Sequence, residues 1–147
     1  MKILLPYNTN FGLFEYRWSA NERIVKGGIE RFCYQIYDTF PDVEILEIDN
    51  QLPPKVNANE IKTYAKNVGA DIIISNWIQA SFAGAKIVDS EVPILVICHE
   101  NSQMLGTLNT FKRLQEYHHS LVFMSTYQKM KIDQMAKRVK HPEILVD

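Results

Sequence analysis

The chain has 147 residues, 46% of them hydrophobic and 22% charged, which is the composition of one globular domain with a buried core. The 16 Lys and Arg residues nearly balance the 17 Asp and Glu residues, so overall charge argues neither for nor against a nucleic-acid partner. The apolar run at the N-terminus is too short for a signal peptide, and no segment is long and apolar enough to be a transmembrane segment. Cys33 and Cys98 lie in apolar segments without a C-x-x-C pair. This favours buried free thiols, and a cytoplasmic setting, over a disulfide or a metal site.

Strand-like and helix-like stretches alternate from one end of the chain to the other. In chain order we expect a strand at Lys2–Pro6, a helix at Gly28–Phe40, a strand at Val43–Ile48, a loop at Gln51–Val56, a helix at Asn59–Val68, a strand at Asp71–Asn76, a helix at Ile78–Asp89, a strand at Pro93–Cys98, a helix at Asn109–Tyr117, a strand at Leu121–Met124 and a helix at Thr126–Val139. Gly69 stands at the usual position of a C-terminal helix cap. The rhythm predicts one α/β domain over residues 1–147, with a Rossmann-like three-layer α/β/α architecture and a mainly parallel sheet.

The stretch Asn8–Gly27 is long for a connection between a strand and a helix, and it is expected to be irregular. It carries aromatic and cationic side chains, among them Tyr16, Arg17 and Trp18. Such side chains can stack on sugars or bases and attract phosphate. Alternatively, the aromatic residues fold back onto the domain as a lid or a small local core. Both interpretations stay open.

The same stretch ends in Gly27-Gly28, directly at the start of the first predicted helix. Free backbone N–H groups and the helix dipole make such a place a natural anion site, although a tight turn explains the two glycines equally well. The sequence contains neither G-x-G-x-x-G nor G-x-x-x-x-G-K-[ST]. A dinucleotide-binding enzyme and a P-loop NTPase are therefore disfavoured.

Polar residues follow three of the predicted strands. His99 and Glu100 come after the buried run Val92–Cys98, and both can move protons. Open α/β sheets bind ligands at the carboxyl ends of their strands, which makes this pair the first candidate for chemistry. Asn76 ends the third predicted strand and Trp77 follows it, and helix capping by Ser75 or Asn76 is the alternative interpretation. Ser125-Thr126 follows the fifth strand and is interpreted as a helix cap.

Two features near the C-terminus have plain explanations. His118 and His119 are neighbours at a helix end, where a cationic side chain is favourable and where both cannot easily bind one metal. The last predicted helix is basic, which is typical of a solvated face and alternatively of a surface for an acidic partner or DNA backbone.

Four short motifs together carry a family resemblance: Lys-Ile-Leu-Leu-Pro at residues 2–6, Gly27-Gly28, the strand Asp71–Asn76, and Cys98-His99-Glu100. With these motifs in this order, nearly the whole chain resembles the N-terminal domain of GT-B glycosyltransferases. In that fold two Rossmann-like domains face each other, the N-terminal one receiving the acceptor and the C-terminal one holding a nucleotide-sugar. The phage glucosyltransferases that modify hydroxymethylcytosine in DNA look similar here, with an acidic residue at the position of Glu100.

The resemblance implies roles for particular residues. Gly27 and Gly28 match the phosphate-binding loop that approaches the donor. Glu100 and His99 match a catalytic pair beside the reacting sugar, in which the carboxylate takes the proton of the acceptor hydroxyl and the imidazole orients the sugar or helps to shuttle the proton. In a retaining enzyme the donor phosphate can accept that proton, and Glu100 then only positions the acceptor. The candidate acceptor-binding residues are Tyr16, Arg17, Trp18, Asn76 and Trp77.

The chain stops at Asp147, about where that family passes from the acceptor domain to the donor domain. The resemblance therefore implies an acceptor half that is incomplete on its own, with a nucleotide-sugar as donor substrate, no other cofactor and no metal. The donor domain would come in cis or in trans, and the acceptor would be modified DNA or a saccharide. Glu22 and Glu30 share the Glu-x7-Glu spacing of retaining enzymes, but that signature belongs to the donor domain, so they receive no role.

Two other interpretations stay open. The chain could be a non-catalytic glycosyltransferase-like module for binding or regulation, or an unrelated flavodoxin-like domain that binds a small phosphate ligand. A domain that faces a partner should also expose an apolar wall, expected around Trp18, Trp77 and Met104, through which homo-oligomers could form.

Overall fold

The structure, a computed structural model, describes residues 1–11, 14–15, 17–24, 27–49, 51–76, 86–98 and 112–138. Its elements are the strands β1 (Ile3–Asn8), β2 (Asn10–Phe11), β3 (Phe14–Glu15), β4 (Val43–Ile48), β5 (Ile72–Ser75), β6 (Ile94–Cys98) and β7 (Ser120–Phe123), and the helices α1 (Gly28–Thr39), α2 (Pro54–Asn67) and α4 (Thr126–Arg138). Residues 112–116 are also helical. The predicted helix Ile78–Asp89 falls mostly outside the described residues.

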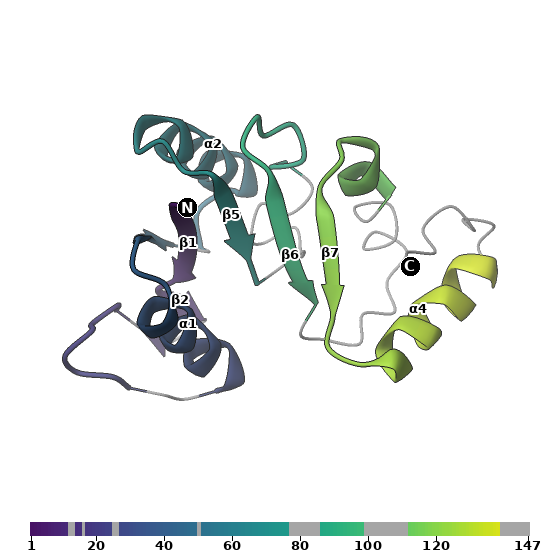
Figure 1. Cartoon of the computed structure of the whole chain (residues 1–147), viewed down its shortest axis with the longest axis horizontal. Coiled ribbons are helices and arrows are strands. Elements are labelled where there is room, and N and C mark those ends of the chain that lie inside the picture. The colour runs from purple at the N-terminus through teal and green to yellow at the C-terminus, as the bar shows by residue number, and fades with distance from the viewer. Residues whose placement is uncertain are drawn as a thin grey trace.

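Five of these strands form one sheet in the order β4-β1-β5-β6-β7, and each neighbouring pair is parallel (Figure 1). All six residues of β1 are buried, as expected for a central strand covered on both faces. The predicted α/β fold is confirmed, and this sheet is parallel throughout rather than mainly parallel. The arrangement is consistent with a Rossmann-like three-layer fold.

Helices cover both faces of the sheet. Leu4 and Leu5 are successive residues of β1, and they belong to different cores because side chains alternate along a strand. Leu5 packs in a cluster with Cys33 of α1. Leu4 packs in a cluster with Ile61 of α2 and Ile132 of α4. We call these faces the α1 side and the α2 side.

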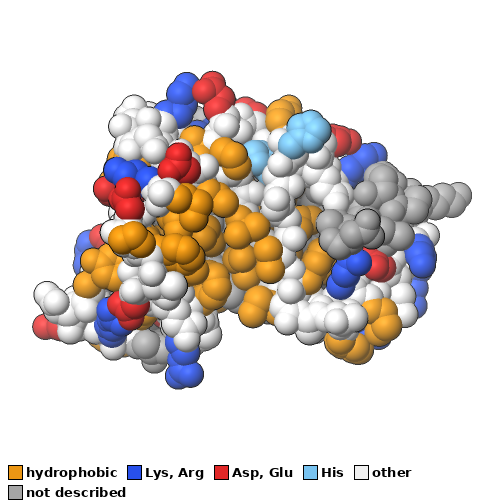
Figure 2. All heavy atoms as spheres, viewed as in Figure 1, with side chains coloured by type: hydrophobic (Ala, Val, Ile, Leu, Met, Phe, Trp, Pro, Cys, Tyr) orange, Lys and Arg blue, Asp and Glu red, His pale blue; other side chains and the backbone are white. Residues whose placement is uncertain are grey.

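The α1 side is apolar beyond the part that α1 covers. Figure 2 shows hydrophobic side chains gathered over the region where Figure 1 draws β1, β5 and β6. Ile72 and Leu95 are only partly buried there, and Val122 of β7 is 37% exposed. The wall predicted around Trp18, Trp77 and Met104 is not tested as such, because Trp77 and Met104 lie outside the described residues and Trp18 is half-buried.

Two details of the fold differ from the sequence-based expectation. The loop predicted over Gln51–Val56 is partly helix, because α2 begins at Pro54 rather than at Asn59. Proline has no N–H to lose in the first turn of a helix, so Pro54 opens α2 instead of blocking it. The connection after β1 contains an antiparallel pair, β2 and β3, where an irregular segment was expected.

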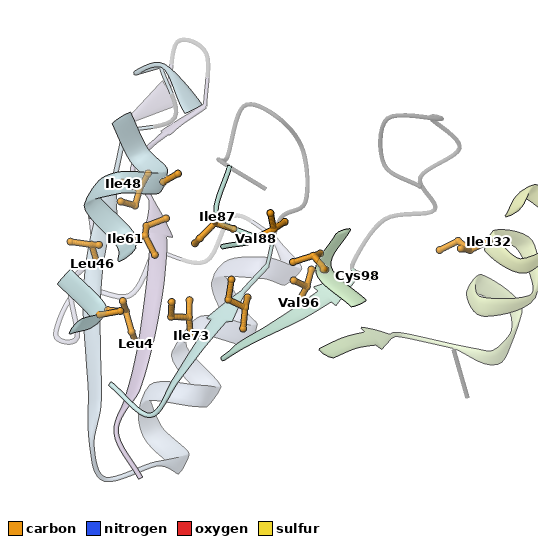
Figure 3. Close-up of a cluster of buried hydrophobic side chains, with 14 residues drawn as sticks. Leu4, Leu46, Ile48, Ile61, Ile73, Ile87, Val88, Val96, Cys98 and Ile132 are labelled. Atoms are coloured by element: carbon orange, nitrogen blue, oxygen red, sulfur yellow. The ribbon is translucent and has the colours of Figure 1, made fainter. Parts of the chain in front are cut away.

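The end of α2 agrees with the sequence. Gly69 has a φ of +66°, its N–H donates to the carbonyl of Lys66, and the N–H of Ala70 donates to the carbonyl of Ala65. The helix is thereby closed just before β5. Its apolar residues complete the core on the α2 side, where Ile48 and Ile61 lie beside each other (Figure 3). No helix within the described ranges has the length and apolarity needed to cross a membrane.

Candidate functional site

The strand order puts a topological switch point between β1 and β5. The chain leaves β1 for β4 on one side, and returns from β4 to β5 on the other. In open α/β sheets the carboxyl ends of strands at such a point are the usual place for a ligand. The candidate site is therefore the edge where β1 and β5 end.

Pairing between the two strands stops before this edge. The β1–β4 ladder runs to Asn8↔Ile48, whereas the β1–β5 ladder extends from Ile3↔Ile72 to Leu4↔Ile73. Pro6 follows within β1 and has no N–H to donate to a ladder. The last residues of β1 and β5 are thus adjacent in the sheet without being paired to each other.

Polar side chains occupy both strand ends. The exposed fractions are 3% for Asn8, 8% for Thr9, 3% for Ser75 and 3% for Asn76. These four are buried polar residues in an otherwise apolar sheet, and buried polar groups are normally hydrogen-bonded.

Several of their partners are known. The N–H of Thr9 donates to the carbonyl of Ile48 at 2.9 Å, and its hydroxyl donates to the same oxygen at 3.3 Å. Asn76 donates its amide hydrogen to the sulfur of Cys33 at 3.4 Å. That bond places the predicted acceptor-binding residue Asn76 on the α1 side, against the second turn of α1.

The first half of α1 lies over this edge and changes its acid–base properties. Burial, followed by the charges of neighbouring Tyr34 and Glu30, raises the pKa of Tyr7 well above its usual range. Burial and the carboxylate of Glu30 also raise the pKa of Cys33 to about 12, despite the opposing hydrogen bond from Asn76. Near neutral pH both groups keep their protons, so Cys33 is not a thiolate nucleophile.

Gly27 and Gly28, the predicted phosphate-binding residues, stand at the start of α1 as expected. Gly27 is the N-cap and makes no side-chain capping bond. A Cβ atom on Gly27 would lie 2.9 Å from Oε2 of Glu30, so the carboxylate of this first-turn residue is folded back over the N-cap. A carboxylate there already interacts with the positive end of the helix dipole and repels a second anion. The phosphate role stays a prediction, and Glu30 is a residue that the sequence analysis set aside.

Trp18, a predicted acceptor-binding residue, is part of an aromatic cluster. Its ring stacks on Tyr34 with centroids 4.6 Å apart, and meets Tyr7 and Tyr37 edge-on at 5.2 and 5.3 Å. The backbone N–H of Trp18 donates to the carboxylate of Glu47 at 2.6 Å. At Trp18 the loop therefore folds back onto the domain, which is the second of the two interpretations of this stretch.

Arg23 and Arg17, the two cations of this loop that the structure describes, lie in different environments. The guanidinium of Arg23 hydrogen-bonds both carboxylate oxygens of Asp38 on α1 and lowers the pKa of that carboxyl group. Arg17, another predicted acceptor-binding residue, is exposed. Arg23 thus fastens the loop to α1, and Arg17 stays a candidate ligand contact.

The remaining predicted residues, Tyr16, Trp77, His99 and Glu100, lie outside the described residues. The end of β6, which immediately precedes His99, is described. Gln128 is 3% exposed, and its amide nitrogen donates to the carbonyl oxygen of Cys98 at 2.7 Å. Its side-chain oxygen accepts from the N–H of Met124 at 2.7 Å. The first turn of α4 therefore holds the chain at the point where the predicted catalytic pair begins.

Sequence reasoning missed Gln128, although a signal was present. Ser125-x-x-Gln128 matches the capping-box pattern, and the predicted cap is confirmed because Ser125 Oγ accepts from the N–H of Gln128 at 3.0 Å. In a capping box the glutamine side chain would reach back to the N-cap. Here it reaches the backbone of Cys98 in β6 and of Met124, the residue after β7, instead.

The part of the chain that the structure describes holds no group of three or more His, Cys, Asp or Glu residues that could bind a metal ion.

Comparisons of the chain with protein-family models, with curated proteins and with solved structures found no match.

Proposed function

We propose that this domain binds the acceptor in a glycosyl transfer, at the edge where β1 and β5 end. The observation that carries the proposal is the presence of four buried polar residues at that edge, Asn8, Thr9, Ser75 and Asn76. Hydroxyl and carboxamide groups are suited to hydrogen bonds with sugar hydroxyls. The carboxylate of Glu30 at the start of α1 disfavours an anion at the same place. Both features support a neutral, hydroxyl-bearing ligand.

The proposed chemistry places a general base beside that ligand. The acceptor oxygen forms a bond to the anomeric carbon of the sugar while the bond from that carbon to the nucleotide phosphate breaks. In the inverting form Glu100 takes the proton of the acceptor hydroxyl, and His99 orients the sugar. The bond from Gln128 to the carbonyl of Cys98 supports this role, because it restrains the backbone next to the pair.

The donor would be a nucleotide-sugar held by a second domain, in cis or in trans. Gly27 and Gly28 are the proposed contact for its phosphates, and Glu30 would have to turn away for them to approach. Glu30→Gln is therefore expected to tighten nucleotide-sugar binding in the complete enzyme. The proposal includes a cytoplasmic setting, in keeping with the two free cysteines.

The test is a transfer assay with a panel of nucleotide-sugars and with hydroxymethylated DNA or saccharides as acceptors, with and without a donor domain. Transfer that requires both parts supports the proposal. Glu100→Gln should then lower turnover at least about 100-fold. Glu91→Gln, an exposed residue before the start of β6, is the matched control and should leave turnover unchanged.

Two outcomes count against the proposal. Unchanged turnover in Glu100→Gln removes the general base from Glu100. Saturable acceptor binding by this chain, with no transfer in any combination, favours the non-catalytic binding module instead.

A further inference from the structure

Two buried carboxamide oxygens, Asn8 Oδ1 and Asn57 Oδ1, have no hydrogen-bond partner within the described part of the chain. Asn8 is 3% exposed and Asn57 is fully buried. A buried acceptor without a donor costs stability, so such groups in native proteins usually have a bound partner.

The two carboxamides belong to the same face and the same end of the sheet. Asn8 is paired in register with Ile48, and registered residues of parallel strands point to the same side. Ile48 packs in the core of the α2 side (Figure 3), so the side chain of Asn8 also lies there. The amide nitrogen of Asn57 donates to the carbonyl of Asp49, the next residue, at 2.9 Å. Both carboxamides therefore adjoin Ile48 and Asp49, below the first turns of α2.

The acceptor character of Asn57 follows from its other bond. Its nitrogen must face the carbonyl of Asp49, because exchanging nitrogen and oxygen would place two acceptors together. Its oxygen therefore points elsewhere and needs a donor. Asn8 supplies a second oxygen with the same need, and neither group carries a charge.

We propose that Asn8 and Asn57 bind one small neutral molecule that donates two O–H groups, one to each carboxamide oxygen. A water molecule has this chemistry, and so does a pair of adjacent sugar hydroxyls. A water molecule would be a permanent part of the fold and would link α2 to the end of β1 through hydrogen bonds. A sugar would enter from the switch point beside Asn8. Of these two donors, only the sugar rests on the proposed function.

The first experiment measures the thermal midpoint of Asn8→Leu, Asn57→Leu and the double variant. The exposed Asn59→Leu on α2 gives the baseline for the same substitution. With a resident donor, Asn8→Leu loses a hydrogen bond and Tm falls by roughly 3–6 °C. Because one molecule serves both oxygens, the double variant falls by less than the sum of the single variants. A high-resolution crystal structure should then show a water within hydrogen-bond distance of both oxygens.

The second experiment distinguishes the two sources. If the donor is a ligand, Asn8→Leu removes an unpaired acceptor from the free protein, so Tm rises. Affinity for methyl α-D-glucoside or hydroxymethylcytosine DNA, measured by calorimetry, should then fall at least about 10-fold.

The outcomes that overturn the inference are equally definite. One is a fall in Tm that is additive across the two positions, which indicates packing damage only. The other is a rise in Tm without loss of probe affinity, including the case in which the wild-type chain binds neither probe. Failure of the proposed function leaves the resident-water result intact, since that result needs no substrate.

Discussion

The side-chain amide of Gln128 donates to the carbonyl oxygen of Cys98 across 2.7 Å and thereby connects α4 to the last residue of β6. The two residues are separated by 30 positions in the sequence. The carbonyl belongs to the peptide bond that joins Cys98 to His99. A residue of α4 thus restrains the backbone at the carboxyl edge, where we propose that the chemistry takes place.

Replacing Gln128 with Leu should destabilise the domain by about 1–3 kcal/mol, because the buried carbonyl of Cys98 loses its donor. The matched control is Gln134→Leu, an exposed position on the same helix, which should change stability by less than about 0.5 kcal/mol. Urea unfolding of both variants measures the difference. Equal effects at the two positions would show that the Gln128 bond contributes nothing.

The adjacent histidines should respond in opposite directions. His119 is 8% exposed, its Nδ1 accepts from the N–H of Ile94 at 3.1 Å, and its Nε2 donates to the carbonyl of Val88 at 2.7 Å. His119→Phe leaves both backbone groups without a partner and should cost about 2–5 kcal/mol. His118 is exposed with a φ of +63°, so His118→Gly should be neutral or stabilising by up to about 1 kcal/mol.

Denaturant unfolding curves of the two histidine variants check this contrast. A small effect of His119→Phe would show instead that water reaches the backbone groups of Ile94 and Val88.

Cys33 and Cys98 should make stability depend on alkaline pH. Burial raises the pKa of each thiol from 9.0 to about 12, with Glu30 adding to the effect at Cys33. Between about pH 9 and about pH 12 the thiols of the unfolded chain have lost protons that the native state retains. The free energy of unfolding therefore falls as pH rises through this range, and the contribution of the two thiols is fully present below about pH 9. Unfolding free energies from about pH 8 to about pH 11 measure the slope, and Cys33→Ala with Cys98→Ala should reduce it.

A companion measurement is the reaction of the native chain with a thiol reagent at neutral pH. The reaction should be slow and should accelerate strongly in denaturant, because a buried, protonated thiol is not a nucleophile. Rapid labelling of Cys98 in the native state would contradict the burial of the end of β6.

Alanine substitutions at two glycines should change stability in opposite directions. A Cβ on Gly28 would meet nothing within 4 Å, so Gly28→Ala should stabilise α1 by up to about 1 kcal/mol. Gly69 has a positive φ, so Gly69→Ala should destabilise by about 1 kcal/mol. Thermal unfolding distinguishes them, and a destabilising Gly28→Ala would show that this backbone is in a closer contact than the structure indicates.

The location of the candidate site could be predicted from the sequence, but only some of its residues could. The carboxyl edge of a parallel sheet follows from the alternation of apolar strands and helices, and Gly27, Gly28 and Asn76 were located there from the sequence. Gln128 and Asn57 were not, because their partners, Cys98 and Asp49, depend on how α4 and α2 pack on the sheet. Tyr16, Trp77, His99 and Glu100 stay predictions.

The sequence by itself determined the type and order of the main strands and helices that the structure describes, although not the short β2–β3 pair. The predicted strand Val43–Ile48 has the same bounds as β4. The helix α1 begins at Gly28 as predicted and ends before Pro41, and Gly69 caps α2. These features depend on side-chain periodicity and on the backbone preferences of single residues, which act over a few positions and can be read locally.

Only the tertiary structure decided which side chains these elements bring together. The strand order puts β1 between β4 and β5, buries Asn8 at the switch point, and sets Trp18 against α1. Neighbouring residues in the sequence acquire opposite environments, as His118 and His119 do. Burial and hydrogen bonding depend on contacts between segments far apart in the chain, and no local pattern encodes those contacts.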